Sequence, residues 1–119
     1  MDTKNLQQIA VAHARSTWAI LERTHGKMVF PAFEFSNRYT KTAGACFMTE
    51  NRIVIGTKFL QQFLPQMIAT IIPHELCHQV DFNKNGIPKN NRWHGPSWQK
   101  IMLQYGLPAD TYHTLDLKK

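Results

Sequence analysis

The sequence has few cysteines, few acidic residues and no long apolar run, and each shortage excludes a class of protein. Its two cysteines, Cys46 and Cys77, are not spaced as a CxxC pair. We therefore exclude a disulfide scaffold or a zinc ribbon, and we expect a reducing, cytoplasmic setting. No stretch reaches the roughly 18 apolar residues that a membrane span needs. The first residues lack a basic segment followed by an apolar one, so we expect no secretory signal.

The shortage of acidic residues leaves the chain strongly basic. Eight Asp and Glu residues stand against fourteen Lys and Arg residues in 119, which gives a formal net charge of +6. This excess favours an anionic partner, most often nucleic acid, and a basic surface that only keeps the protein soluble is the alternative. If the source is bacterial, we expect association with the nucleoid. The candidate DNA-contacting residues are Arg38, Lys41, Lys84, Lys89 and Arg92.

Length and apolar pattern predict one α+β domain over residues 1–119, because two halves would each have too small a core. We expect it to be a monomer. Asp2 or Thr3 can cap the first helix, and Gly26 can end it. Pro31 places the first strand at an edge or a bulge. The predicted elements are a helix over 5–25, strands over Met28–Phe35, Ala45–Met48 and Arg52–Gly56, a short helix over Lys58–Leu64 capped by Thr57 and ended by Pro65, a main helix over Gln66–Phe82, a polar loop over Lys84–Arg92, and a last helix from Pro96 to Gly106.

Residues His74-Glu75-Leu76-Cys77-His78 form an HExxH motif. On a helix, positions i and i+4 lie on one face, so both imidazoles can reach the same ion. Glu75 lies one step round the helix, beside the metal, where it can accept a proton from the attacking water. Pro73 is unusual inside a helix, so we expect either a bend before the motif or the true start of the helix there. The motif predicts a zinc peptidase with Glu75 as the general base.

A catalytic zinc usually has three protein ligands, so a third ligand must lie elsewhere in the chain. No Glu follows Glu75, which excludes a distant glutamate, and Lys84 occupies the position of a closely spaced third histidine. His94 is favoured because it stands directly before the last helix, where the packing of Trp98 and Met102 could direct it towards the motif. The other candidates are His113, Asp81, Asp110 and Asp116.

From about Thr42 to its end, the sequence resembles the SprT-like metallopeptidases, a family that includes bacterial SprT and eukaryotic Spartan. The resemblance rests on an ordered set of segments rather than on one motif, and the proline before the motif also recurs in bacterial members. The segments are Thr42-Ala43-Gly44-Ala45, Arg52-Ile53-Val54-Ile55, Phe59-Leu60, Ile72-Pro73-His74-Glu75-Leu76-Cys77-His78, His94-Gly95-Pro96-Ser97-Trp98, Met102, and Tyr105-Gly106-Leu107-Pro108.

The resemblance implies that His74, His78 and His94 bind Zn²⁺ and that Glu75 is catalytic. It also implies a minimal zincin-like fold: an N-terminal helix, a small three-stranded sheet, the metal helix and a closing helix. Spartan-like members cleave proteins crosslinked to DNA, so the expected partners are a protein substrate and DNA, single-stranded or crosslinked. Many relatives carry a C-terminal cysteine-rich zinc-binding segment, and this chain has no such cysteines. DNA contact is then expected from basic residues of the catalytic domain or from a partner.

The leading hypothesis is metal-assisted hydrolysis of a peptide bond in a substrate that adds as a strand to the sheet. A second hypothesis is a catalytically silent, zinc-stabilised module that binds nucleic acid. A third keeps the zinc and replaces the protein substrate by another kind of molecule. The candidates for stabilising the oxyanion are Tyr112, His113 and Arg92.

Overall fold

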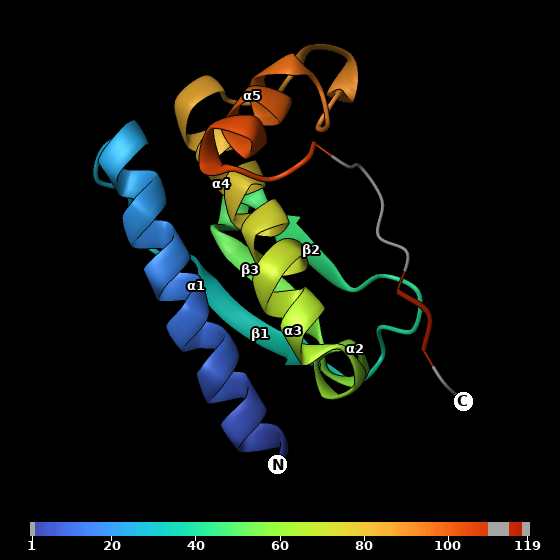
Figure 1. Ribbon diagram of the computed structural model, residues 1–119. Coiled ribbons are helices and arrows are strands. Elements are labelled where there is room, and N and C mark those ends of the chain that lie inside the picture. The colour runs from blue at the N-terminus through green and yellow to red at the C-terminus, as the bar shows by residue number, and fades with distance from the viewer. Residues whose placement is uncertain (1, 110–114, 118–119) are drawn as a thin grey trace.

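Two helices cover one face of a three-stranded sheet in the computed structural model (Figure 1), which describes residues 2–109 and 115–117. The helices are α1 (Thr3–His25) and α4 (Ile72–Asn85). Their C-terminal ends meet, because Lys84 Nζ lies 3.0 Å from His25 Nδ1. The predicted α+β class, with an N-terminal helix and a small sheet, is confirmed.

The sheet has the strand order β1-β3-β2, so the last strand in sequence lies in the middle. Strand β1 (Ala32–Ser36) runs parallel to β3 (Arg52–Gly56), and β2 (Gly44–Phe47) runs antiparallel to it. Strands β2 and β3 form a hairpin whose turn contains the left-handed residue Asn51, at φ 49°. Asparagine tolerates this conformation better than most residues. The sheet therefore has two outer strands, β1 and β2, and β2 is the one nearer α4.

The strand predicted over Met28–Phe35 is wrong in its first half, because β1 begins at Ala32. Pro31 has no N–H to donate to a strand partner. Upstream of it, the Trp18 indole donates to the Met28 carbonyl oxygen at 3.2 Å. The Asn51 side chain donates to the Val29 carbonyl oxygen at 3.2 Å. Side chains thus bind carbonyl groups that a strand neighbour would otherwise bind.

Helix α1 begins where its capping residue predicts, with Asp2 Oδ1 accepting from the Asn5 N–H at 2.8 Å. It ends at Gly26, whose φ is 88°. Its buried side chains recur every three or four positions and form the stripe that packs on the core. They are Leu6, Ala10, Ala14, Thr17, Trp18 and Leu21.

The main helix predicted over Gln66–Phe82 is interrupted near its start and extends further at its end. A π-helical turn, η2 (Met67–Ile71), precedes α4, which continues to Asn85. Pro73 lies in the first turn of α4. Since proline lacks an N–H and its ring clashes with the carbonyl four residues earlier, a wider turn at this point accommodates it. Of the two possibilities for Pro73, the start of the helix is confirmed.

The short helix before this turn also differs from its prediction. Helix α2 (Thr57–Gln62) starts at Thr57 itself, and Gly56 is the cap residue, without a side-chain hydrogen bond. Pro65 does not end that helix but lies at the start of the next one, α3 (Leu64–Gln66). This position suits proline, because the first N–H groups of a helix have no partner within it.

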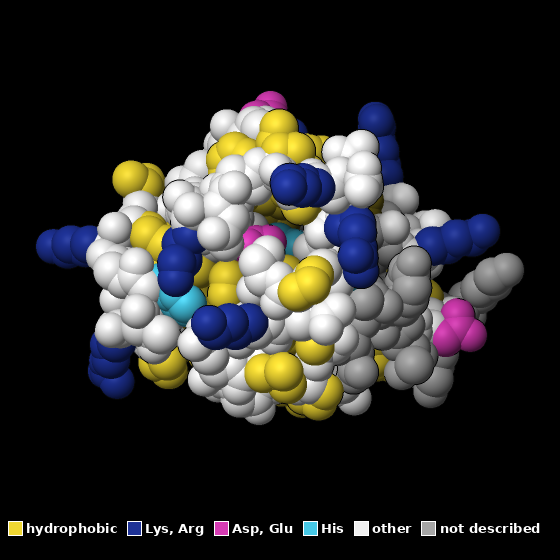
Figure 2. All heavy atoms as spheres, turned by 90° about the horizontal axis from the view of Figure 1, so that it is seen from above, with side chains coloured by type: hydrophobic (Ala, Val, Ile, Leu, Met, Phe, Trp, Pro, Cys, Tyr) yellow, Lys and Arg dark blue, Asp and Glu magenta, His cyan; other side chains and the backbone are white. Residues whose placement is uncertain are grey.

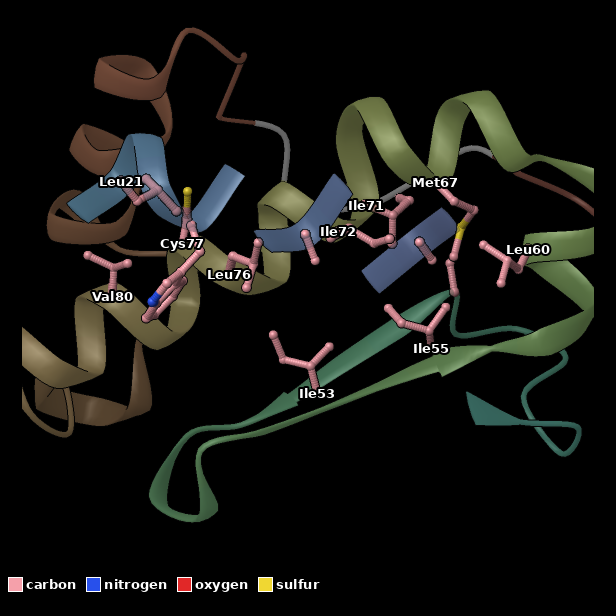
Figure 3. Close-up of a cluster of buried hydrophobic side chains, with 14 of the residues drawn as sticks. Leu21, Ile53, Ile55, Leu60, Met67, Ile71, Ile72, Leu76, Cys77 and Val80 are labelled. Carbon is pink, nitrogen blue, oxygen red and sulfur yellow. The ribbon is translucent and has the colours of Figure 1, made fainter. Parts of the chain in front are cut away.

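A continuous apolar core joins the sheet to the helices. Ile53 and Ile55 of β3 face Leu76 of α4, and all three are fully buried (Figure 3). Burying each such side chain stabilises the fold by about 1.5–3 kcal/mol. Cys77 belongs to the same cluster. This packing fixes the face of α4 that carries the HExxH motif relative to β2.

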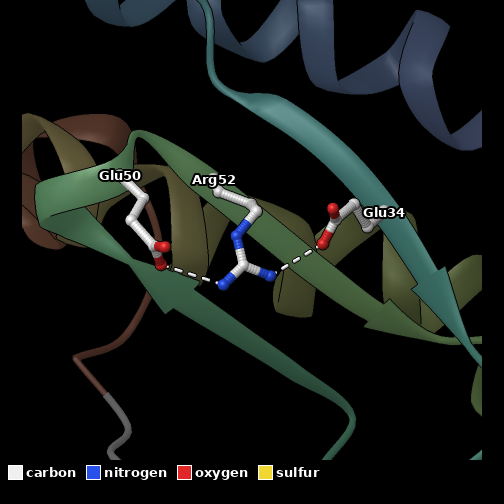
Figure 4. Close-up of polar contacts among 3 residues, drawn as sticks. All are labelled: Glu34, Glu50 and Arg52. Atoms are coloured by element: carbon white, nitrogen blue, oxygen red, sulfur yellow. Dashed lines mark hydrogen bonds and ion pairs between the residues drawn. The ribbon is translucent and has the colours of Figure 1, made fainter.

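The outer face of the sheet carries an ion-pair network. The Arg52 guanidinium donates to Glu34 Oε2 at 2.7 Å and to Glu50 Oε2 at 2.9 Å (Figure 4). These groups are partly exposed, so each pair contributes little to stability. The network nevertheless ties the hairpin turn to the neighbouring strand β1.

Helix α5 (Pro96–Tyr105) closes the structure over the end of α4. It begins with Pro96 in its first turn and ends at Gly106, at φ 107°, as predicted. The Leu107 N–H donates to the Met102 carbonyl oxygen at 3.0 Å, which is typical of a helix end with a left-handed glycine. Between α4 and α5 lies a short 3₁₀ turn, η3 (Lys89–Asn91). None of the helices in the described residues has both the length and the apolarity to cross a membrane.

Candidate metal centre

Three histidine side chains converge beside the N-terminal half of α4. His74 and His78 lie one helical turn apart, and their Nε2 atoms are 3.2 Å from each other. His94 precedes α5, and its Nε2 lies 3.3 Å from that of His74. One nitrogen from each ring lies within 4.8 Å of the other two. The three residues could therefore hold one metal ion.

The spacing of these nitrogens fits a tetrahedral metal. Zinc–nitrogen bonds of about 2.0–2.1 Å at tetrahedral angles place two ligand nitrogens about 3.3 Å apart. The observed separations are 3.2 and 3.3 Å. Burial, and then the neighbouring His74 and His94, lower the pKa of His78 to about 2. Burial also lowers the pKa of His94. Neutral imidazoles at neutral pH leave lone pairs for a cation.

Trp98 of α5 forms the floor beneath all three histidines. Its indole stacks on His78, with 4.9 Å between ring centroids and 14° between planes. It meets His74 and His94 edge-on, at 4.7 and 4.8 Å. The other ring nitrogen of His78, Nδ1, is buried and accepts or donates no hydrogen bond within the described part of the chain. On the Nδ1 side, stacking on Trp98 rather than a hydrogen bond within the described residues therefore orients the His78 ring.

Glu75 lies beside the histidine cluster and not within it. Its side chain is buried, and Oε2 is 3.9 Å from His74 Nε2. Burial raises the pKa of this carboxyl group from 4.5 to about 8. A divalent cation on the histidines would favour the carboxylate form, because an opposite charge at this distance lowers the pKa of an acid.

The cluster opens into a cleft with a volume of about 510 Å³. Seen from above, an acidic side chain and a histidine are visible in a hollow, and Lys and Arg side chains surround it (Figure 2). One wall is the outer edge of β2 with the segment that precedes it, and the other is α4 with the segment before α5. The lining residues are Lys41, Thr42, Ala43, Gly44, Cys46, Met48, Ile71, His74, Glu75, His78, Trp93 and His94.

Gln79 of α4 connects this helix to the wall of the cleft that β2 forms. It is almost fully buried, and its Nε2 donates to the Met48 carbonyl oxygen at 3.0 Å. Its Oε1 accepts from the Cys46 thiol at 3.5 Å. Burial, and then the charge of Glu75, raise the pKa of the Cys46 thiol. These contacts hold the end of β2 against α4, one residue after His78.

Glycine at position 44 allows β2 to approach Glu75 closely. A Cβ atom there would lie 3.3 Å from Glu75 Cγ, and equally close to the side chains of Ile55 and Ile71. Such contacts are tighter than ordinary van der Waals packing, so any larger residue would have to displace its neighbours.

Of the remaining candidate ligands, the two that the structure describes, Asp81 and Asp116, do not join the cluster. His113 and Asp110 lie outside the described residues, as does Tyr112. Asp116 is exposed. Asp81 is buried and accepts from the Asn85 side chain at 2.9 Å.

The basic residues predicted to contact DNA are all exposed, and they come from three separate segments of the chain. Lys41 lines the cleft. Lys89 and Arg92 lie in and after η3, in the segment that leads to His94. Lys84 contacts His25 instead. Arg38 borders a second hollow beside the cleft, together with Lys41.

Sequence reasoning missed several residues of the site. Gln79 could have been noticed as a polar residue between the buried positions His78 and Val80 of α4. Gly44 was recognised only as part of a family segment. Trp93 and Met48, which line the cleft, carried no signal of their own.

A family model for the SprT-like family matches residues 11–113. The protein SprT of Actinobacillus succinogenes is 32% identical over 77 residues, which cover 64% of this chain and 44% of that protein. The protein SprT of Shewanella oneidensis is 30% identical over 87 residues, which cover 72% of this chain and 53% of that protein. The chain thus spans about half the length of the curated relatives it matches. No solved structure matches the chain significantly.

Proposed function

The chain belongs to the SprT-like family, and on that premise we propose that it is a zinc-dependent endopeptidase. The observation that carries the proposal is the convergence of three imidazole nitrogens beside a buried carboxyl group at the base of a cleft. A structural zinc site normally has four protein ligands, whereas a catalytic one has three and an open position. The described residues offer three.

In this proposal His74, His78 and His94 hold the zinc ion. When bound, zinc polarises the scissile carbonyl and makes water a nucleophile near neutral pH. Trp98 contacts all three imidazole rings and holds their orientation. His94 lies directly before α5, so the packing of α5 positions this ligand. The donor set of neutral imidazoles in a tetrahedral spacing supports zinc, although such rings also bind copper and nickel.

Glu75 is the proposed general base. Its carboxylate takes a proton from the attacking water and later gives it to the nitrogen of the leaving amine. Its buried position beside the histidines suits this double role, because the positive charge of a bound zinc ion would favour the carboxylate form that accepts the first proton. The close approach of Gly44 limits the directions in which this carboxylate can turn.

The proposed substrate is an extended polypeptide that pairs with the outer edge of β2. This strand pairs only with β3 among the described strands, so its other edge can accept main-chain hydrogen bonds. The same strand lines the cleft through Gly44 and Cys46. Pairing of an extended peptide with an exposed edge would bring its backbone past the three histidines.

We further propose that the substrates are proteins associated with DNA or crosslinked to it. The net charge of +6 and the Lys and Arg side chains around the cleft support an anionic partner (Figure 2). Lys41 lines the cleft, and Lys89 and Arg92 lie in the segment that leads to Trp93 and His94, which also line it. A zinc-stabilised module that binds nucleic acid without cleaving is the alternative.

Metal removal followed by restoration tests the proposal. The full chain would be stripped with a chelator, reloaded with zinc, and incubated with an unfolded protein bound to single-stranded DNA. We expect cleavage only by the reloaded protein, and faster cleavage when DNA is present. Zinc-dependent DNA binding without cleavage would favour the alternative. Zinc-dependent cleavage at the same rate with and without DNA would support the peptidase function and contradict the proposed DNA partner.

A further inference from the structure

A further hollow, different from the one that Arg38 borders, adjoins the cleft that the three histidines line and has a volume of about 240 Å³. It lies at the end of β2 and under the segment that links α4 to α5. We call it the side pocket, and its lining residues are Cys46, Phe47, Met48, Thr49, Glu50, Ile87 and Trp93. Three of these residues, Cys46, Met48 and Trp93, also line the metal cleft. The two hollows are therefore continuous along one wall.

The lining of the side pocket is mainly apolar and partly exposed to solvent. Phe47 is 38% exposed and Ile87 is 64% exposed. Single apolar residues on a surface are common, but here they face one hollow together with Trp93 and Met48. The Arg52 guanidinium lies 4.2 Å from the centre of the Phe47 ring and holds it in place. The one acidic side chain of the lining, Glu50, is paired with Arg52 at 2.9 Å.

We propose that the side pocket binds one apolar side chain of the polypeptide whose backbone lies in the metal cleft. This inference rests on the proposed peptidase function. The shared wall supports the substrate chain itself as the occupant, because a chain that follows β2 past the histidines reaches the side pocket next. An apolar side chain there would displace water from Phe47 and Ile87, which is favourable.

The geometry also gives the position of this side chain. Gly44 lies against Glu75, and Phe47 lines the side pocket. Three residues of strand span about 10 Å, at about 3.3 Å for each residue. An extended substrate beside β2 advances by the same distance for each residue. The apolar side chain therefore lies about two or three positions from the scissile bond.

A set of peptides tests this inference with the zinc-loaded full chain. Each peptide would carry one Leu in an otherwise polar sequence, moved by one position from peptide to peptide, with matched peptides that carry Ser or Lys instead. We expect kcat/KM to be highest when Leu stands two or three positions from the cleaved bond. One apolar contact in a pocket is worth roughly 10–200-fold, so the Leu peptide should exceed the Ser peptide by at least about tenfold.

A substitution at Ile87 shows whether the side pocket causes the preference. Ile87→Asp should reverse it, so that the Lys peptide is cleaved faster than the Leu peptide, a gain that unfolding cannot produce. The control is Leu103→Asp, because Leu103 is also 64% exposed but lies on α5 outside the lining of both hollows. It should keep the preference for Leu.

Two kinds of failure remain distinguishable. Equal cleavage of all peptides, or an unchanged preference in Ile87→Asp, would overturn the role of the side pocket and leave the peptidase intact. If the zinc-loaded protein cleaves neither these peptides nor an unfolded protein, the proposed function is wrong, and the inference about the side pocket falls with it.

Discussion

The Trp98 indole lies parallel to the His78 imidazole at 4.9 Å, and it also touches the rings of His74 and His94. Its Nε1–H points to the His74 carbonyl oxygen at 3.5 Å. One buried residue of α5 therefore contacts every candidate ligand, including the two on α4. Orientation of metal ligands by the groups behind them commonly affects metal affinity by 10–100-fold.

Replacing Trp98 by Phe should weaken metal binding without unfolding the protein. Phenylalanine keeps an aromatic ring under the histidines but removes part of the stacking area and the Nε1–H. We expect zinc affinity, measured by competition with a chromophoric chelator, to fall at least about tenfold. Trp98→Ala is less informative, because a cavity of this size costs about 3–5 kcal/mol of stability.

Trp18→Phe is the matched control for this experiment. Trp18 is also buried, and its Nε1–H also donates to a backbone carbonyl oxygen, that of Met28, at 3.2 Å. It lies in α1, outside the histidine cluster. The Trp18→Phe substitution should lower the free energy of unfolding and leave the zinc affinity unchanged. Equal losses of affinity in both variants would mean that Trp98 acts only through general stability.

The identity of the third ligand is a separate prediction. Zinc should raise the unfolding temperature of the wild-type chain, because a ligand that binds only the folded state stabilises it, by about 4 kcal/mol at a thousand times its dissociation constant. His94→Ala should lose most of this zinc-induced shift, whereas His113→Ala should retain it. The opposite pattern would make His113 the ligand.

How far the site could be predicted from sequence differs from residue to residue. The meeting of His74 and His78 follows from the i, i+4 spacing, because helix geometry alone brings the two rings together. The approach of His94 depends on how α5 packs on α4 through Trp98, and no local pattern carries that information. Sequence reasoning therefore favoured His94 but left four alternatives. The roles of these residues stay predictions.

The errors in the fold prediction have related causes. The first half of the strand predicted over Met28–Phe35 is wrong, because Trp18 and Asn51 supply the hydrogen bonds that a strand partner would supply there. The continuous helix predicted over Gln66–Phe82 missed the π-helical turn, because a single such turn is too short to change the apolar pattern of the whole segment. The first error arises from contacts between residues distant in sequence. The second arises from backbone detail that the apolar periodicity does not encode.

Gly44→Ala should lower activity more than stability. The added methyl group would press on Glu75 Cγ at 3.3 Å, and displacing a catalytic group by about 1 Å can cost 100-fold in rate. We expect kcat to fall about tenfold while the free energy of unfolding changes by about 1 kcal/mol or less.

Gly106→Ala gives the reverse pattern and serves as the control. Gly106 has φ 107° and no atom within 4 Å of its added Cβ, so alanine there strains the end of α5 and lowers stability. Its kcat should not change. If Gly44→Ala also kept its kcat, the proposed confinement of Glu75 by β2 would be wrong.

The contribution of the Glu75 carboxyl group to the stability of the metal-free protein should decrease as pH rises from about 4.5 to about 8, whereas the lowered pKa of His78 acts in the opposite direction up to about pH 6.5. Burial raises the pKa of Glu75 over this range, so the folded state holds the proton more tightly than the unfolded state. The resulting stabilisation is complete below the unfolded pKa and is lost as pH rises through the folded pKa. At about 1.4 kcal/mol per pKa unit, the loss is at most about 5 kcal/mol.

Denaturant unfolding in a chelator checks this pH dependence. Glu75→Gln cannot ionise, so it should be more stable than wild type near pH 8 and equally stable near pH 4. The lowered pKa of His78 affects both proteins alike and cancels in the comparison. Parallel stability curves for the two proteins would show that the Glu75 carboxyl group titrates normally.

The central claim is that Glu75 takes a proton from the attacking water and is not a ligand of the metal. The direct measurement is zinc content and cleavage rate for Glu75→Gln, with Glu34→Gln as a control, since Glu34 pairs with Arg52 on the outer face of the sheet. The account predicts that Glu75→Gln keeps the wild-type zinc content and loses about 10²–10⁴-fold in kcat, while the control keeps both. A fully zinc-loaded Glu75→Gln that cleaves as fast as wild type would contradict it.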